Sequence, residues 1–436
     1  MLSQERVIMT RRPQYRGRIL KASSTAIRTA LAFVIMLSTV ILTSGSAQAQ
    51  FIVLHTFLGL PDGAEPMAGL TPDSKGNLYG TTYFGGASSC NFEGCGVVYK
   101  VTKSGMGTVL YRFAGGTDGV LPTAPVAVDT QGNVYGTTPY GGGSGCSGNG
   151  CGIVFKISPQ GKETVLYRFT GGTDGGNPFT TVLLDQAGTL YGATALGGDA
   201  TCQAGYGCGV IYKLTQAGIE TVLHTFTGGA DGADPQVERS AMDAEGNIYG
   251  TTYDGGDPIC NCGVAFKVNQ GGELTVLHTF TGGADGSFPY HGLTLGAKGV
   301  LYGTASLGGA VSGVLFRISS TGLNVLYNFS SYPFAIGSIS SVSVCSDGNV
   351  YGTTQGGGTE GWGTLWRVDR TGKETIVHTF GYTPDGATPD GAVQWMMKDG
   401  GGALFYGTTT QGGKGSFGQG TVYAVALDSE TQTCLP

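Results

Sequence analysis

One short string recurs seven times along the chain and constrains its fold more than any other feature. Tyr-Gly followed by two residues drawn from Thr and Ala starts at Tyr79, Tyr135, Tyr191, Tyr249, Tyr302, Tyr351 and Tyr406. The successive spacings are 56, 56, 58, 53, 49 and 55 residues. Self-similarity at such a period is typical of repeat architectures, and it indicates seven copies of one structural unit.

Two further strings recur in step with the first. A string of the type Gly-Val-Val-Tyr-Lys has its second residue at Val97, Ile153, Val210, Val264, Val314, Thr364 and Thr421. A string of the type Val-Leu-His/Tyr-x-Phe starts at Val53, Val109, Val165, Val222, Val276, Val325 and Ile376. With the apolar run before each Tyr-Gly string, they divide each unit into four β-branched and aromatic segments separated by turn residues, the pattern of short strands.

A four-stranded meander of this length cannot bury both of its faces alone. Radial repetition packs each sheet on its neighbours and leaves only short free edges. We therefore predict an all-β fold, a seven-bladed β-propeller of four-stranded antiparallel blades, with strands a, b, c and d in chain order and strand a innermost. An eight-bladed ring or an open solenoid is the alternative.

The two ends of the repeat predict how the ring closes. Residues 51–57 form a d strand that no a, b or c strand precedes, and the seventh unit stops after its c strand. We expect the N-terminal strand to complete the last blade.

Glycine makes up 80 of the 436 residues, beside 16 Pro. This excess has no triplet period, which excludes collagen. The 40% hydrophobic and 10% aromatic residues are enough for a packed core, which argues against general disorder. We assign most of the glycine to turns that need a positive φ.

The first residues have the pattern of an export signal. Residues 1–29 carry seven Arg or Lys and one acid, an apolar run follows at 30–42, and Ala47-Gln48-Ala49 forms a small-x-small cleavage signal. We predict a signal peptide over 1–49, a single propeller domain over 50–428 and a tail over 429–436. An uncleaved anchor is the alternative, although the run is short for a membrane helix.

Charge limits the partners of the mature chain. Removing seven of 24 basic and one of 30 acidic residues leaves 17 and 29, a net charge of −12. With no basic stripe, we do not expect a nucleic-acid partner. We expect no membrane span in the mature chain, a monomeric state and no cofactor.

The repeat as a whole resembles a known family. Gly-Asn-Leu-Tyr-Gly-Thr-Thr, Gly-Val-Val-Tyr-Lys, Val-Leu-His-Thr-Phe and Gly-Gly-Ala-Asp-Gly together are similar to the GloVer tandem repeat of exported bacterial proteins, over 51–427. The resemblance implies export and residence at the cell surface or outside the cell, and it implies no known reaction. With the signal peptide, we expect a secreted, cell-surface or periplasmic protein.

In such a meander the a–b and c–d turns lie on one face of the disc, here the turn face, and the b–c and d–a loops lie on the other, the loop face. Four b–c loops carry cysteine pairs: Cys90/Cys95, Cys146/Cys151, Cys202/Cys208 and Cys260/Cys262. We predict loop-local disulfides, the closely spaced last pair being the most strained. A zinc site would need four converging ligands, so we expect no metal. A bond between the remaining Cys345 and Cys434 would staple the tail.

Residues that follow the repeat are interpreted as scaffold. His55, His224, His278 and His378 share a position with Tyr111, Tyr167 and Tyr327, which indicates inter-blade packing. The Asp-Gly pairs of the d–a loops indicate turns rather than calcium ligands. The strand-c Lys and Arg residues, such as Lys100 and Lys156, also repeat, and a site should break the repeat.

Residues that break the repeat are the site candidates. Counting back from the Asp that ends strand a, one position holds four small residues, a Gln, Glu238 and His291, and Arg239 follows Glu238. We expect Glu238, Arg239 and His291 at the mouth of the central channel, where a Glu/His pair could act as general acid and base. A salt-bridged polar entrance is the alternative.

We predict a secreted binding module that recognises a carbohydrate or a protein through its loop face. Aromatic residues of the b–c loops would supply contacts: Tyr83, Phe84, Tyr140, Tyr206 and Tyr253. Packing of the loops onto the disc is the alternative role for each of them. Because no nucleophile motif, phosphate-binding loop or metal-ligand spacing is present, we favour binding over catalysis. A polysaccharide lyase or hydrolase at the channel mouth is the alternative.

Overall fold

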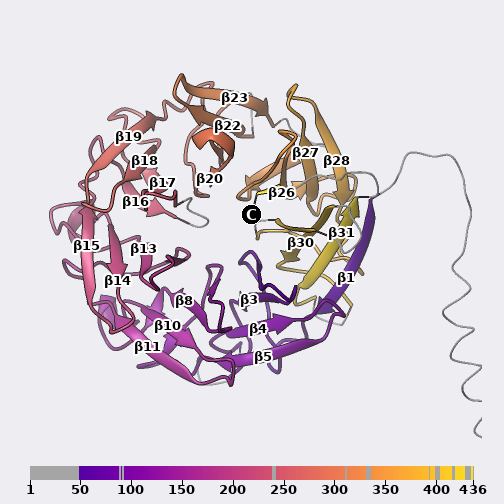
Figure 1. Ribbon diagram of the computed structural model, residues 1–436, viewed down its shortest axis with the longest axis horizontal. Helices are drawn as coiled ribbons and strands as arrows, with labels where there is room; N and C mark the ends of the chain where they lie inside the picture. Colours follow the sequence, from indigo (N-terminus) through magenta and orange to yellow (C-terminus); the bar gives the residue numbers. More distant parts are fainter. Residues whose placement is uncertain are drawn as a thin grey trace, which may run out of the picture. The chain divides into compact units, whose positions relative to one another are not determined.

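The computed structural model describes residues 49–87, 90, 93–237, 242–309, 312–329, 335–391, 393–397, 403–414, 418–427 and 434–435. Seven antiparallel sheets surround a central axis (Figure 1). Six of these sheets contain four strands and that of blade 6 contains six; the strands of a blade pair in chain order, except that the N-terminal strand β1 pairs with β31 in blade 7. The seven-bladed β-propeller predicted from the repeat is confirmed.

Each of the first four blades is one repeat unit. Blade 1 contains β2 (Thr71–Pro72), β3 (Leu78–Thr82), β4 (Val97–Val101) and β5 (Gly107–Arg112). Blade 2 contains β7 (Ala127–Val128), β8 (Val134–Thr138), β10 (Ile153–Ile157) and β11 (Glu163–Arg168). Blade 3 contains β12 (Leu183–Leu184), β13 (Leu190–Thr194), β14 (Val210–Leu214) and β15 (Glu220–Thr225). Blade 4 contains β16 (Ala233–Gln236), β17 (Ile248–Asp254), β18 (Val264–Val268) and β19 (Leu274–Thr279).

The last three blades differ in how their inner and outer edges form. Blade 5 contains β20 (Thr294–Leu295), β21 (Leu301–Ala305), β22 (Val314–Ser319) and β23 (Gly322–Asn328). Blade 6 contains β24 (Ala335–Ile339), β25 (Ser343–Cys345), β26 (Val350–Gly357), β27 (Thr364–Val368) and β28 (Glu374–Thr379). Blade 7 contains β29 (Gln394–Met397), β30 (Ala403–Thr409), β31 (Thr421–Leu427) and β1 (Gln50–Thr56).

Short elements complete the described secondary structure. A two-stranded ribbon joins β6 (Gly119–Val120) to β9 (Tyr140–Gly141), and the last strand is β32 (Cys434–Leu435). Three single-turn 3₁₀ helices are η2 (Cys146–Gly148), η3 (Gln203–Gly205) and η4 (Ala297–Gly299). Among the described residues, no helix has the length and apolar character to cross a membrane.

The first strand closes the ring, as predicted. β1 pairs antiparallel with β31, in a register that runs from Gln50 opposite Ala426 to Thr56 opposite Thr421 (Figure 1). A hydrogen bond from the Thr408 hydroxyl of blade 7 to the Ala68 carbonyl of blade 1 links the same two ends of the ring.

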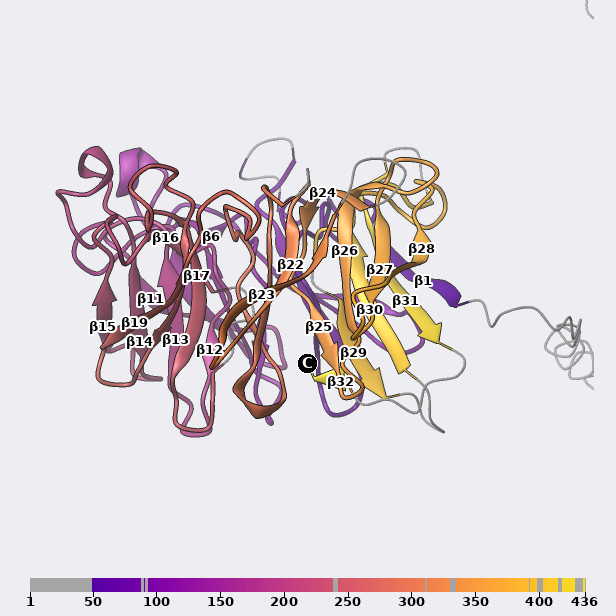
Figure 2. The ribbon, with the colours of Figure 1, turned by 90° about the horizontal axis from the view of Figure 1, so that it is seen from above.

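The tail adds a second clasp. β32 pairs with β25, so it extends blade 6 on its inner edge (Figure 2). A disulfide joins Cys345 of β25 to Cys434 of β32. The repeat suggested this staple only through two leftover cysteines, and the docking of the tail as an additional strand was not predicted.

One aromatic contact recurs at all seven seams between blades. The Phe that follows each d strand packs edge-to-face on the strand-c aromatic of the next blade, with ring centroids 4.9–5.3 Å apart. Phe57 on Tyr99 and Phe380 on Tyr423 are two of these pairs. Two of the three repeated strings therefore encode the contact that joins successive blades.

The glycine of the Tyr-Gly string is needed for steric reasons and lies in the middle of strand b. A Cβ added at Gly136 would lie 2.5 Å from the Phe155 ring, which is fully buried on the neighbouring strand. The assignment of most glycines to turns therefore does not apply to Gly136, which lies within a strand. A strand glycine here marks the close approach of an aromatic side chain.

Candidate functional site

A cavity of about 250 Å³ opens at the channel mouth on the loop face. Five blades contribute to it, because its wall comes from the segments that enter the innermost strands. The lining residues are Met67, Ala68, Gly69, Tyr83, Thr123, Pro125, Phe179, Tyr290, His291, Asp390 and Gly391. We call this cavity the mouth pocket.

A repeated proline fixes the segments that form the mouth pocket. At six seams the Cδ of this proline lies close to the glycine that precedes strand c of the previous blade, so that a glycine Cβ would be 2.5–3.0 Å away. These prolines are Pro66, Pro122, Pro178, Pro235, Pro289 and Pro389.

The residue after each anchoring proline varies in every blade. Five of these six residues line the mouth pocket: Met67, Thr123, Phe179, Tyr290 and Asp390. A fixed backbone thus presents five different side chains to one cavity. The repeated proline marks this variable position in the sequence, and the position was not among the predicted site residues.

Aromatic rings form much of the wall. Tyr83 packs edge-on against Phe84, with centroids 4.6 Å apart. Tyr290 lies 5.2 Å from the His291 ring and 5.9 Å from Tyr253. Tyr83 and Tyr290 therefore each pack on a second ring rather than forming the wall as isolated side chains.

Polar groups of the mouth pocket complement these rings. The Gln355 amide donates a hydrogen bond of 2.6 Å to Asp390, which fixes that carboxylate. His291 is 4% exposed. The Thr123 hydroxyl is buried and has no hydrogen-bond partner among the described residues, so it could bond to a ligand atom.

The predicted site residues separate into groups. Tyr83 and His291 line the mouth pocket, whereas Glu238 and Arg239 lie outside the described residues. By the proline anchors, Val237 rather than Glu238 occupies the position equivalent to His291, because blade 4 has one additional residue between its proline and Asp243.

The other predicted aromatic residues lie around the pocket or away from it. Phe84 supports Tyr83, Tyr140 lies 6.0 Å from the Phe179 ring, and Tyr253 lies against Phe288 and Tyr290. Tyr206 ends η3 and is 65% exposed.

The cysteine pairs of the b–c loops are disulfides, as predicted: Cys90–Cys95, Cys146–Cys151, Cys202–Cys208 and Cys260–Cys262. Within the described ranges, no group of three or more His, Cys, Asp or Glu side chains is arranged to hold a metal ion. The bonds stiffen loops on the loop face and suit an oxidising compartment.

The repeated His and Tyr residues of the d strands bond to the repeated Asp seven residues later. His55, His224, His278 and His378 lie 2.9–3.3 Å from Asp62, Asp231, Asp285 and Asp385. The Tyr111 and Tyr167 hydroxyls donate to Asp118 and Asp174 in the same way. These pairs fix the d–a turns. The interpretation of the His and Tyr residues as inter-blade packing did not include their Asp partners.

One strand-d position of the next blade differs between the two residue types. After a blade with Tyr, this position holds Glu163, Glu220 or Glu374. After a blade with His, it holds Gly107, Leu274, Leu323 or Phe51. Tyr111 donates to Glu163 at 3.2 Å and Tyr327 to Glu374 at 2.8 Å. The Phe51 ring instead stacks on His378, with centroids 3.9 Å apart.

Comparison with known proteins gives a family match and distant structural neighbours. The family model of the Gloeobacter/Verrucomicrobia repeat matches residues 38–202 and 143–340, which together exceed half of the chain. The search of curated proteins finds no match.

The structural neighbours include carbohydrate-active enzymes. An ulvan lyase, from a polysaccharide lyase family, has a TM-score of 0.50 at 11% identity, over 88% of this chain and 98% of that chain. A family AA12 carbohydrate-active enzyme of Trichoderma reesei has a TM-score of 0.37 at 13% identity, over 88% and 97%. At these identities the likeness to the lyase shows a shared fold and carries no conclusion about activity.

Proposed function

The chain belongs to the Gloeobacter/Verrucomicrobia repeat family, and we propose that it is an exported binding module whose mouth pocket holds one residue of a carbohydrate. The observation that carries this proposal is the variation at the proline-anchored positions. A repeat that keeps its packing contacts the same in every blade changes its side chain at the wall of a single cavity.

The chemistry of the wall favours a sugar ring. Tyr83, Phe179 and Tyr290 offer aromatic faces and edges, on which the C–H face of a pyranose can pack. His291, Asp390 and the unpartnered Thr123 hydroxyl offer hydrogen bonds to sugar hydroxyls. The volume of 250 Å³ lies just below the usual range of about 300–1,000 Å³ for ligand sites, so it suits a single residue of a glycan rather than a large ligand.

Catalysis at the channel mouth is the second candidate. It would use His291 with Glu238 and Arg239, of which only His291 lies in the described part of the chain. Turnover of an acidic polysaccharide, lost on His291→Ala, would favour a lyase or hydrolase over a binding module.

A glycan array tests the binding proposal. We expect the mature chain to bind a restricted set of glycans. We also expect Tyr83→Ala and Tyr290→Ala each to weaken the best-bound glycan by about tenfold, because loss of one aromatic contact removes about 1.4 kcal/mol. The control is Trp362→Ala, which removes a 40% exposed aromatic residue outside the mouth pocket. Equal binding by the two pocket variants and the control would show that the mouth pocket is not the site.

A further inference from the structure

The described wall of the mouth pocket carries a negative charge and no permanent positive charge. Asp390 is the only Asp or Glu among the described lining residues, and none of these residues is Lys or Arg. The one further titratable base among them is His291, which is 4% exposed. A cavity with a carboxylate and no lysine or arginine in its described wall favours a cation over an anion.

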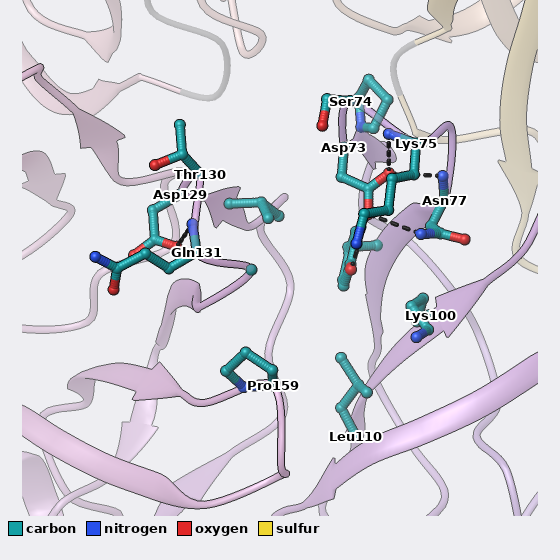
Figure 3. A pocket seen from close by; sticks show the side chains of 14 residues that line it. Asp73, Ser74, Lys75, Asn77, Lys100, Leu110, Asp129, Thr130, Gln131 and Pro159 are labelled. Carbon is teal, nitrogen blue, oxygen red and sulfur yellow. Dashed lines mark hydrogen bonds between the residues drawn. The ribbon is translucent and has the colours of Figure 1, made fainter.

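A cleft on the turn face, between blades 1 and 2, has a different charge pattern. Its volume is about 370 Å³, and Asp73 and Asp129 line it together with Lys75 and Lys100 (Figure 3). Desolvation raises the pKa of Asp73, but hydrogen bonds from Asn77 and Lys75 outweigh it and leave the pKa lowered. Charges of both signs therefore line this cleft, and it selects neither cations nor anions.

The carboxylate of the mouth pocket is held in place from two sides. Asp390 follows Pro389, whose Cδ would lie 2.5 Å from a Cβ added at Gly363, so the backbone is fixed against blade 6. The Gln355 side chain of β26 donates a hydrogen bond of 2.6 Å to Asp390. A carboxylate has about four acceptor positions, so one that an amide orients can still accept hydrogen bonds from a ligand.

Three aromatic side chains share the cavity with this carboxylate. Tyr83, Phe179 and Tyr290 belong to three different blades and line the same wall. The faces of aromatic rings attract a cation that lies within about 6 Å of the ring centroid. Rings and a carboxylate around one small cavity are the groups that bind an ammonium ion.

A second carboxylate adds negative potential near Tyr83. The Glu65 carbonyl accepts hydrogen bonds from the Tyr83 and Met67 backbone amides, at 3.0 and 2.9 Å. Desolvation is the largest cause that raises the pKa of Tyr83, followed by Tyr140 and the charge of Glu65. The charge of Glu65 therefore acts on the Tyr83 ring, and like that of Asp390 it favours a cation.

We propose that the mouth pocket selects a sugar residue with a free amino group, whose ammonium binds Asp390 while the ring packs on the aromatic wall. This inference rests on the proposed function and names the class of sugar. An ammonium group can donate three hydrogen bonds. The Thr123 hydroxyl and His291 offer further bonds for neighbouring sugar hydroxyls, which a lysine side chain lacks.

Three hexasaccharides that differ only at carbon 2 test the proposal by calorimetric titration. The β-1,4-linked glucosamine hexamer carries an amino group at this carbon, chitohexaose an acetamide and cellohexaose a hydroxyl. At pH 5.5 the amino groups are largely protonated. We expect the glucosamine hexamer to bind at least about tenfold more tightly than either of the others, because it alone forms a charged hydrogen bond with Asp390.

A single variant assigns this preference to the carboxylate. Asp390→Asn keeps the size of the side chain and removes its charge, so the glucosamine hexamer should bind about tenfold more weakly, and cellohexaose within about twofold of its wild-type affinity. The control Glu360→Gln removes the same charge from an exposed residue of the blade 6 b–c loop, outside the pocket lining. It should bind all three within about twofold of the wild type.

Three results would overturn the inference. The first is equal binding of the three hexasaccharides. The second is equal binding of the glucosamine hexamer by Asp390→Asn and the Glu360→Gln control. The third is tighter binding of hexalysine than of the glucosamine hexamer, which would assign the pocket to a basic peptide.

The proposed function fails on a different result. If Tyr83→Ala weakens all three hexasaccharides equally, the mouth pocket binds sugars without selecting an amino group, and only this inference is wrong. If neither Tyr83→Ala nor Tyr290→Ala weakens any bound glycan, the mouth pocket is not the binding site, and the proposed function is wrong as well.

Discussion

Replacing Glu163 by Gln tests an inter-blade contact that weakens as pH rises. The Tyr111 hydroxyl lies 3.2 Å from both Asp118 and Glu163, and it can donate only one hydrogen. One of the two carboxyl groups has to carry a proton for both contacts to be hydrogen bonds. Desolvation is the largest effect that raises the pKa of Glu163, followed by the charge of Asp118 and a hydrogen bond to it. Together they raise this pKa from 4.5 to about 7, against the lowering effects of Tyr111 and Arg168.

The sign of the effect follows from this raised pKa. A carboxyl group with a higher pKa in the folded state stabilises the fold fully below pH 4.5, and the contribution is lost as pH rises through about 7. The difference between a pKa of 4.5 and one of about 7 corresponds to at most about 3.4 kcal/mol. Because Glu163 is partly exposed, solvent screening reduces this to about 1–2 kcal/mol.

The Gln side chain keeps the shape of Glu163, accepts from Tyr111 and donates an N–H to Asp118. We therefore expect Glu163→Gln to raise the Tm by about 1–3 °C at pH 8 and to leave it unchanged at pH 5. Thermal unfolding at both pH values measures this, with Glu245→Gln, an exposed residue, as the control for net charge. The reasoning is refuted if the variant is less stable than the wild type at pH 8, or if its Tm difference is the same at both pH values.

Three further changes test the fold and its rim. Gly136→Ala should destabilise the propeller by about 1–3 kcal/mol, because the new Cβ would lie 2.5 Å from Phe155. Adding Phe155→Leu should restore part of this stability, as measured by chemical denaturation. No loss in Gly136→Ala would show that the propeller does not need a glycine at this position. Cys434→Ser should lower the free energy of unfolding by about 4–5 kcal/mol and Cys95→Ser by about 2 kcal/mol. The first disulfide joins residues 89 positions apart and the second joins residues 5 positions apart, so the first removes more entropy from the unfolded chain. Equal losses in Tm would contradict this argument. Glu220→Gln should raise the Tm at pH 8 as Glu163→Gln does, because desolvation and the charge of Asp174 raise the Glu220 pKa to about 7. Thermal unfolding measures this change, and a lower Tm than that of the wild type would contradict the prediction.

The sequence predicted the ring because the contacts that build it repeat. Three strings at seven positions encode the strands, and two of these strings contain the aromatic residues that meet at each seam, such as Phe113 and Phe155. The unpaired strand at residues 51–57 and the missing d strand of the last unit predicted the closure between β1 and β31.

The site was harder to predict because it depends on residues that the repeat does not keep. Counting back from Asp243 aligned Glu238 with His291, whereas the contact of Pro235 with Gly209 aligns Val237 there. Tyr290 and Phe179 were missed since neither lies on a b–c loop. The docking of β32 on β25 depends on two tail residues, which are too short a segment for a strand pattern.

A crystal structure of the mature chain with its best-bound oligosaccharide tests the central claim most directly. We predict that one sugar residue occupies the mouth pocket, packs on Tyr83 or Tyr290 and bonds to Asp390 or the Thr123 hydroxyl. A sugar bound elsewhere on the loop face, with the mouth pocket containing only water, would contradict the claim.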